Sequence, residues 1–165
     1  MEAIDALKKR RSIRSFKNNS VDRETVKEIL DCARLAPSAN NIQPWEFVVV
    51  ENAAMRKEIA SLTDYGGFIR EAPVLIVVLS KNTKYYLEDG CAATMNILNA
   101  AYALGLGSCW VAGDKKAYAN KVKELLKVPP GFSLISLIPI GYQGEKGGSM
   151  SSKRTLSEII HWESF

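Results

Sequence analysis

The spacing of apolar residues switches repeatedly along this chain between a helical period and unbroken runs. Five stretches have apolar positions every three or four residues, and they begin near Ile4, Asp22, Asn52, Leu87 and Asp114. Between them lie four short apolar runs, at residues 45–50, 73–79, 108–111 and 134–140. Asp22, Asn52 and Asp114 are suited to cap the helices that follow them. Pro37 is expected to end the second helix.

Two central stretches indicate the fold class. Residues 73–79 (PVLIVVL) have no polar alternation, which is typical of a strand buried on both faces. Residues 87–104 are apolar on most sides and stop before Gly105, so this helix is expected to be central and buried. Strands that alternate with helices around one buried helix predict an α+β or α/β protein in three layers.

The C-terminal tail, residues 156–165, is rich in large apolar side chains: Ile159, Ile160, Trp162 and Phe165. Such side chains need a covering surface. The tail either packs on its own domain or packs on another subunit, and the sequence leaves both arrangements open.

Composition and charge narrow the class of protein. The 165 residues are 47% hydrophobic and 24% charged, which predicts one soluble domain, residues 1–165. The net charge is only +4 and the basic residues are scattered, so a nucleic-acid partner is not expected. No apolar run reaches the ~18–20 residues that span a bilayer, and the N-terminus is too polar for a signal peptide. We therefore expect a cytoplasmic protein without a membrane partner.

Cysteine and histidine usage argues against metal and disulfide sites. Cys32, Cys91 and Cys109 lie far apart without a CxxC pair, so neither a disulfide framework nor a zinc site is indicated. Free thiols suit a reducing compartment. The single histidine, His161, excludes most histidine-based metal centres. We expect no bound metal.

A cluster of guanidinium groups is the first candidate for chemistry. Residues 10–16 (RRSIRSF) place Arg10, Arg11 and Arg14 around the hydroxyl of Ser12. Arginine forks match phosphate oxygens, and each charge-assisted hydrogen bond contributes about 1.5–3 kcal/mol. Lys153 and Arg154, after a Gly/Ser-rich loop, offer further positive charge. The alternative is a solvated basic patch that complements the dipole at a helix C-terminus.

An amide-rich loop is the second candidate. Residues 36–45 (APSANNIQPW) combine two prolines with Asn40, Asn41 and Gln43, whose amides both donate and accept hydrogen bonds. A planar ring with N–H and carbonyl groups needs such mixed partners. The alternative is a turn whose amides satisfy its own backbone. Residues 105–110 (GLGSCW) do not form a dinucleotide fingerprint, because they follow a helix and lack the final glycine.

Together these motifs resemble the nitroreductase family of FMN-dependent oxidoreductases. The likeness rests on RRSIRSF, APSANNIQPWEFVVV, the buried helix that runs into GLGSCWV, and VPPGF followed by LIPIGY. It implies an α+β, three-layer α/β/α fold with a central mixed or antiparallel sheet. It also implies an obligate homodimer with two FMN sites at the subunit interface. This chain would be a compact member, since only residues 80–86 separate one strand from the central helix.

The resemblance also implies roles for particular residues. Arg10 and Arg11 would lie near the phosphate and ribityl end of FMN with Ser12, and Arg14 near the flavin N1/C2 carbonyl. The opposite subunit would contribute Pro37, Ser38, Ala39 and Asn40 along the ring, with Gln43 at a polar edge or the ribityl chain. Ser108 and Cys109 would line the ring with backbone groups, and the phosphate would contact Lys153 or, as second choice, Arg154.

The implied activity is two-electron transfer by a ping-pong sequence, from NADH or NADPH to flavin N5 and then to an organic acceptor such as a nitroaromatic or a quinone. No side chain is needed as an acid–base catalyst, and Arg14 would give electrostatic support. The alternative is a flavin-binding carrier or sensor with little turnover.

Overall fold

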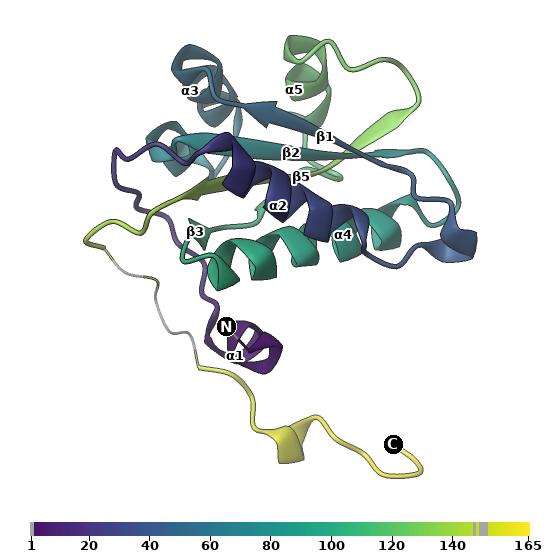
Figure 1. Ribbon diagram of the computed structural model, residues 1–165. Helices are drawn as coiled ribbons and strands as arrows, with labels where there is room; N and C mark the ends of the chain where they lie inside the picture. The colour runs from purple at the N-terminus through teal and green to yellow at the C-terminus, as the bar shows by residue number, and fades with distance from the viewer. Residues whose placement is uncertain (1, 147, 149–151) are drawn as a thin grey trace.

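An antiparallel sheet forms the middle layer of the molecule (Figure 1). In this computed structural model, residues 2–146, 148 and 152–165 are described. The strands are β1 (Trp45–Val50), β2 (Val74–Lys81), β3 (Gly107–Ser108), β4 (Val111–Ala112) and β5 (Phe132–Gly141). Their order is β1-β2-β5-β3, with β4 also paired to β5, and every strand pair is antiparallel. The sheet is thus antiparallel rather than mixed.

Helices cover both faces of this sheet (Figure 1). The α-helices are α1 (Ala3–Lys9), α2 (Arg23–Arg34), α3 (Ala53–Leu62), α4 (Tyr86–Ala103) and α5 (Ala119–Leu125). Short 3-10 helices are η1 (Ala39–Asn41), η2 (Gly67–Glu71) and η3 (Leu156–Glu158). The helices α2 and α4 pack on one face, and α3 and α5 pack on the other.

Strand β2 shows why three layers form. Its side chains alternate between two apolar clusters: Val74, Ile76 and Val78 pack with α2 and α4, whereas Leu75, Val77 and Leu79 pack with α3 and α5. All six are almost fully buried. The predicted strand with two buried faces is confirmed, and the fold is a three-layer α/β/α arrangement of the α+β class.

Helix α4 lies against the sheet at very short range. A Cβ on Gly90 would lie 2.6 Å from Cγ1 of Ile135 on β5, so only glycine permits this approach. The expected central, buried helix is confirmed, since Ile97, Leu98 and Ala101 are almost inaccessible to solvent.

Two of the three predicted caps are confirmed. The side chain of Asp22 accepts a hydrogen bond from Thr25 N at 2.8 Å, and that of Asn52 accepts one from Met55 N at 2.9 Å. The cap predicted at Asp114 is wrong, because α5 begins only at Ala119. Asp114 lies in the preceding turn and accepts a hydrogen bond from the Tyr86 hydroxyl at 3.2 Å.

The prediction of one continuous strand over residues 108–111 is also wrong. The ladder with β5 breaks at Cys109 and Trp110, so β3 and β4 are separate. The strands β3 and β4 pair with β5 in the same register, since Ser108 is opposite Ile140 and Val111 is opposite Leu137. That register would set Cys109 opposite Pro139, which has no N–H to donate to a ladder.

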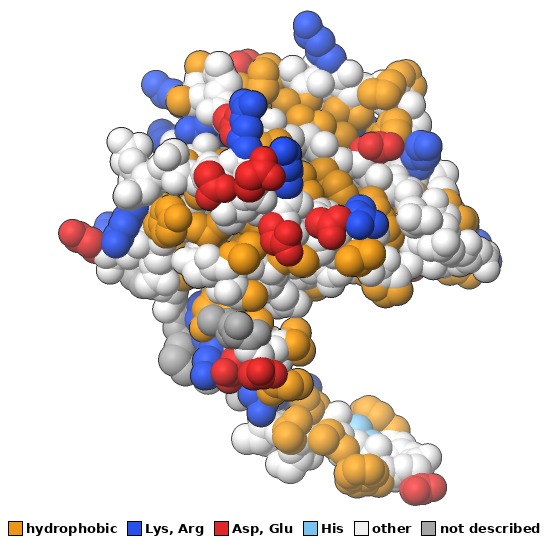
Figure 2. Space-filling model, in the orientation of Figure 1, with side chains coloured by type: hydrophobic (Ala, Val, Ile, Leu, Met, Phe, Trp, Pro, Cys, Tyr) orange, Lys and Arg blue, Asp and Glu red, His pale blue; other side chains and the backbone are white. Residues whose placement is uncertain are grey.

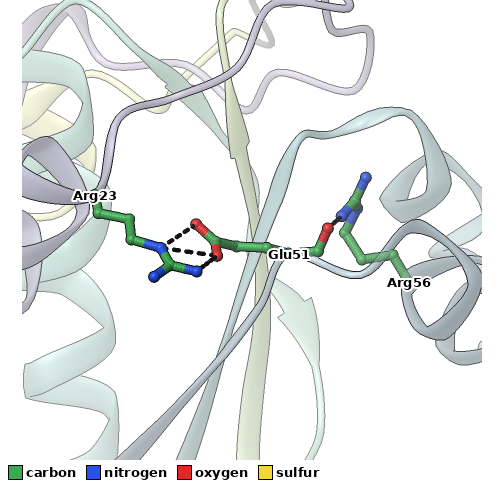
Figure 3. A network of polar contacts seen from close by, with 3 residues as sticks. All are labelled: Arg23, Glu51 and Arg56. Atoms are coloured by element: carbon green, nitrogen blue, oxygen red, sulfur yellow. Dashed lines mark hydrogen bonds and ion pairs between the residues drawn. The ribbon is translucent and has the colours of Figure 1, made fainter.

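A polar network joins elements from both helical layers at the end of β1 (Figure 3). The guanidinium of Arg23, at the start of α2, donates to the Glu51 carboxylate, with Nη2 2.7 Å from Oε2. On the other side, the buried Arg56 of α3 donates to the main-chain oxygen of Glu51. The Arg23 hydrogen bond lowers the pKa of Glu51. Because the Arg23–Glu51 pair is exposed, its main effect is to orient the chain rather than to add much stability.

The C-terminal tail extends away from the body of the chain (Figures 1 and 2). Trp162 is 83% exposed, Phe165 is fully exposed, and every described residue from 152 onwards is exposed. Packing of the tail on its own domain, one of the two arrangements left open above, is therefore not found. Within the described part of the chain, no helix is long and apolar enough to cross a bilayer.

Candidate flavin site

The arginine-rich segment is held along the edge of the sheet. Ile13 N donates to the oxygen of Ser108 at 2.9 Å, and Ser12 forms a parallel bridge with Ser108. Because successive side chains of an extended segment point to opposite sides, Ile13 is buried while Arg14 faces solvent. A Cβ on Gly107 would lie 2.8 Å from Cγ2 of Ile13, so the close approach of the segment to β3 depends on this glycine.

A cationic groove of about 470 Å³ opens beside this segment. Its lining contains five basic residues and no acidic one: Leu7, Lys8, Arg10, Arg11, Ser12, Arg14 and Lys153. Arg11 Nη1 donates to the backbone oxygens of Lys8 and Arg10, each at 2.8 Å, which fixes the side chain. The alternative of a basic patch at the end of α1 accounts for Lys8 but not for Arg14 or Lys153, which come from outside that helix.

A second, smaller hollow of about 150 Å³ adjoins the groove and shares Arg14 with it. Its aromatic lining consists of Tyr65, Phe68, Trp110 and Tyr118, together with Cys109 and the ion pair between Asp64 and Lys116. The Arg14 guanidinium carbon lies 6.0 Å from the centroid of the Phe68 ring. A cationic groove and an aromatic hollow that share one arginine suit a ligand with an anionic end and a planar ring.

Two buried side chains lie where the segment meets the sheet. Burial raises the pKa of the Cys109 thiol, while the nearby Arg14 opposes this shift. The thiol is therefore mostly protonated near neutral pH and is not poised as a nucleophile. The hydroxyl of Ser108 is buried and has no hydrogen-bond partner among the described residues. A buried hydroxyl without a partner is uncommon in proteins, and this one lies beside Ser12.

The amide-rich loop has an unusual backbone. Asn40, Asn41 and Gln43 adopt φ angles of 51°, 55° and 53°, in the left-handed region that few non-glycine residues occupy. Ser38 Oγ accepts a hydrogen bond from Gln43 N at 2.9 Å, and Gln43 Nε2 donates to Asn41 O at 3.1 Å. Gln43 thus satisfies its own loop, as the alternative interpretation of this stretch predicts.

The structure brings together only part of the predicted site. Arg10, Arg11, Ser12, Arg14, Cys109 and Lys153 line the two hollows, and Ser108 lies beside Ser12. The loop residues line neither hollow: Pro37, Ser38, Ala39, Asn40 and Gln43. Arg154 points elsewhere and donates to the oxygen of Glu158. Within one chain, the arginine segment lines the hollows and the amide loop does not, so the structure does not bring the two segments together.

Some lining residues had no signal in the sequence. Lys8, Asp64, Lys116 and Tyr118 join the site only through tertiary packing, and Tyr65 and Phe68 are indistinguishable in the sequence from packing aromatics. In the ranges that the structure describes, no group of three or more His, Cys, Asp or Glu residues could hold a metal ion.

Comparison with known proteins matches this geometry to one family. The model of the "Nitroreductase family" matches residues 7–65 and 61–142. A Methanothermobacter thermautotrophicus protein with the provisional name NADH dehydrogenase/NAD(P)H nitroreductase is 36% identical, over 90% of this chain and 81% of that protein.

Solved structures agree with this match. An FMN-dependent nitroreductase from Clostridium difficile is 34% identical, with a TM-score of 0.91 over 98% of this chain and 99% of that chain. A provisionally named nitroreductase from Desulfovibrio desulfuricans, in complex with FMN, is 32% identical, with a TM-score of 0.87 over 100% and 98% of the two chains. The chain described here belongs to the nitroreductase family.

Proposed function

We propose that this protein binds FMN and passes two electrons from NADH or NADPH to an organic acceptor, such as a nitroaromatic or a quinone, by a ping-pong sequence. Its family membership makes it an NAD(P)H-dependent oxidoreductase. The observation that carries the FMN proposal is the pair formed by a cationic groove and an aromatic hollow that share Arg14.

The residues present fit FMN in their chemistry. The groove offers arginine forks and lysine ammonium groups to a phosphate, with no carboxylate in its lining to repel it. The orphaned Ser108 hydroxyl and the aromatic side chains of the hollow suit the polar edge and the face of a ring. Lys153 lines the groove whereas Arg154 does not, which favours Lys153 as the phosphate ligand.

When bound, FMN supplies the hydride-accepting and electron-donating chemistry, and the protein supplies position and charge. Arg10 and Arg11 would hold the phosphate and ribityl end. Arg14, at the junction of the two hollows, would lie against the N1/C2 carbonyl region and stabilise negative charge there. The rings of Tyr65, Phe68 and Trp110 would offer apolar contact to the flavin ring, beside the ion pair of Asp64 and Lys116.

The amide loop requires a second copy of the chain in this proposal. Residues 37–43 are absent from the lining of both hollows, so they would complete the site of a partner subunit. Apolar side chains that the single chain leaves exposed support such an interface. They lie on α1, directly after α2, in the loop, on α4 and directly after it: Ile4, Leu7, Leu35, Ile42, Met95 and Leu104. Figure 2 shows the apolar side chains along the tail as well.

The purified protein gives the first test. We expect a yellow protein whose released flavin is FMN, and rapid bleaching of the flavin band when NADH or NADPH is mixed anaerobically. A colourless protein that ignores added FMN would refute the proposal. A bound flavin that stays oxidised in both nucleotides would favour the carrier or sensor alternative.

Mixed dimers test the shared site. Arg14→Ala damages the arginine segment, and Asn40→Val damages the loop, because a β-branched residue is strongly disfavoured at φ 51°. If the two segments meet across an interface, a mixed dimer contains one site with both defects and one intact site. Mixed dimers isolated after co-expression should then bind FMN at one of their two sites, with wild-type affinity. No restoration would indicate that both segments serve the same subunit.

A further inference from the structure

Asp89 contacts the amide loop from outside both hollows. It lies in the first turn of α4, is 5% exposed, and accepts a hydrogen bond from Ala39 N at 3.0 Å through Oδ1. We propose that Asp89 is a positioning residue that holds residues 38–43 in the conformation that binds flavin. The proposal rests on the function proposed above and assigns Asp89 no contact with the flavin.

The loop needs such support because its backbone is intrinsically unfavourable. Three of its residues, Asn40, Asn41 and Gln43, have left-handed φ angles, and only asparagine tolerates this region moderately well. The ends of the loop are fixed by packing, since Ala36 and Trp45 form a buried cluster with Ala93 of α4. Between these ends, the Asp89 hydrogen bond and the Ser38–Gln43 hydrogen bond hold the chain.

Helix α4 makes Asp89 a rigid support. Side chains of a helix lean toward its N-terminus, which directs Asp89 toward the loop, and the partial positive charge of that terminus stabilises a carboxylate. The next residue, Gly90, presses against Ile135 of β5, so the backbone here has little room to move. The Asp89 hydrogen bond therefore fixes the loop relative to α4, and α4 is fixed relative to the sheet.

The environment of the second carboxylate oxygen indicates that Asp89 has a role other than filling space in the core. Oδ2 is buried and has no hydrogen-bond partner among the described residues. Burying a polar atom without a partner lowers stability, and an apolar side chain would avoid this cost. The hold of Asp89 on the loop accounts for an aspartate at such a position.

The test compares Asp89→Leu with Asp89→Asn, which keeps an acceptor, and with Glu88→Leu, which removes the neighbouring exposed carboxylate. Hydrogen exchange is followed in the FMN-free protein, and FMN affinity is measured by flavin fluorescence. For Asp89→Leu we expect amide exchange in residues 39–43 to rise about tenfold or more, and FMN binding to weaken by about tenfold. Asp89→Asn should recover most of both losses, and Glu88→Leu should change neither.

A second variant removes the donor instead of the acceptor. Ala39→Pro deletes the N–H, and the site accepts proline because Ala39 begins η1 and Ser38 is already extended, at ψ 151°. In Ala39→Pro, amide exchange at residues 40–43 should rise to the extent expected for Asp89→Leu. This variant tests the proposal even if Asp89→Leu does not fold. Unchanged loop exchange in the folded variants, or exchange that rises equally throughout the chain, would overturn the positioning role. If the wild-type protein binds no FMN, the proposed function fails, while the exchange data still decide whether Asp89 holds the loop.

Discussion

Replacement of Gly107 by alanine should disturb the candidate flavin site without changing any residue that lines it. The added Cβ would lie 2.8 Å from Cγ2 of Ile13 and 2.9 Å from its Cβ and Cγ1. Since carbon atoms pack best at about 3.5–4.0 Å, Ile13 must move by roughly 0.6–1.2 Å. The backbone of Gly107 lies outside the left-handed region, so the alanine itself adds no backbone strain.

The cost follows from what Ile13 contacts. Its side chain is buried, and its N–H donates to the oxygen of Ser108 at 2.9 Å. Overpacking costs about 1–3 kcal/mol and a lost hydrogen bond about 1 kcal/mol, so the free energy of unfolding should fall by about 2–4 kcal/mol. Because Arg14 is the next residue, its guanidinium shifts too. FMN affinity should fall by about tenfold, or about 1.4 kcal/mol.

Urea unfolding and titration with FMN measure the two effects separately. Gly105→Ala is a matched control: its φ of 79° makes alanine strained, but no atom lies within 4 Å of the added Cβ. This control should lose stability and keep its FMN affinity. Ile13→Ala removes two of the three clashing atoms, so the double variant should be less impaired than the sum of the single changes. Wild-type stability and affinity in Gly107→Ala would refute the reasoning.

Three further predictions concern a cap, a thiol and the tail. Hydrogen bonds from Thr25 lower the pKa of Asp22, so the cap stabilises the fold at neutral pH and loses this effect as pH falls through the lowered pKa. Asp22→Ala should therefore unfold at lower urea than wild type at pH 7, by a margin that shrinks as the pH falls through the lowered pKa; a margin that stays the same in acid would contradict an ionised cap. Burial raises the pKa of Cys109, so iodoacetamide should modify the more accessible Cys32 long before Cys109, as peptide mass spectrometry can check. Deletion of residues 153–165 removes Lys153 and the exposed apolar tail, and should abolish FMN binding and yield monomers in sedimentation; a stable dimer that keeps FMN would contradict this.

Local patterns in the sequence predict most of the fold. The unbroken apolar run of β2 indicates two covered faces, and the two confirmed caps, Asp22 and Asn52, each precede a clear helical period. The failures occur where tertiary contacts override local preference. Asp114 binds the Tyr86 hydroxyl instead of starting a helix, and the register with β5 would set Cys109 opposite a proline.

The site is less predictable, because its parts come from distant segments. The charge cluster at Arg10–Arg14 is visible in the sequence, but the hollow that Arg14 shares with Phe68 and Lys116 exists only after η2 and the β4–α5 turn pack together. The left-handed backbone of the loop is equally hidden, since an asparagine pair indicates a turn but not the strain at Gln43. Nor does anything local link Asp89 to Ala39, fifty residues earlier.

Cofactor binding and self-association should be coupled in this protein. In one chain the cationic groove lacks the amide loop, and apolar side chains of α1 and α4 are left exposed. If one interface covers these side chains and also completes the site, FMN binds the dimer in preference to the monomer, and binding must strengthen the dimer by the same factor. Dilution should therefore release FMN, and added FMN should lower the concentration at which the dimer half-dissociates. Fluorescence of released flavin and sedimentation across one dilution series measure both quantities. A monomer that holds FMN as tightly as the concentrated protein would show that each chain carries a complete site.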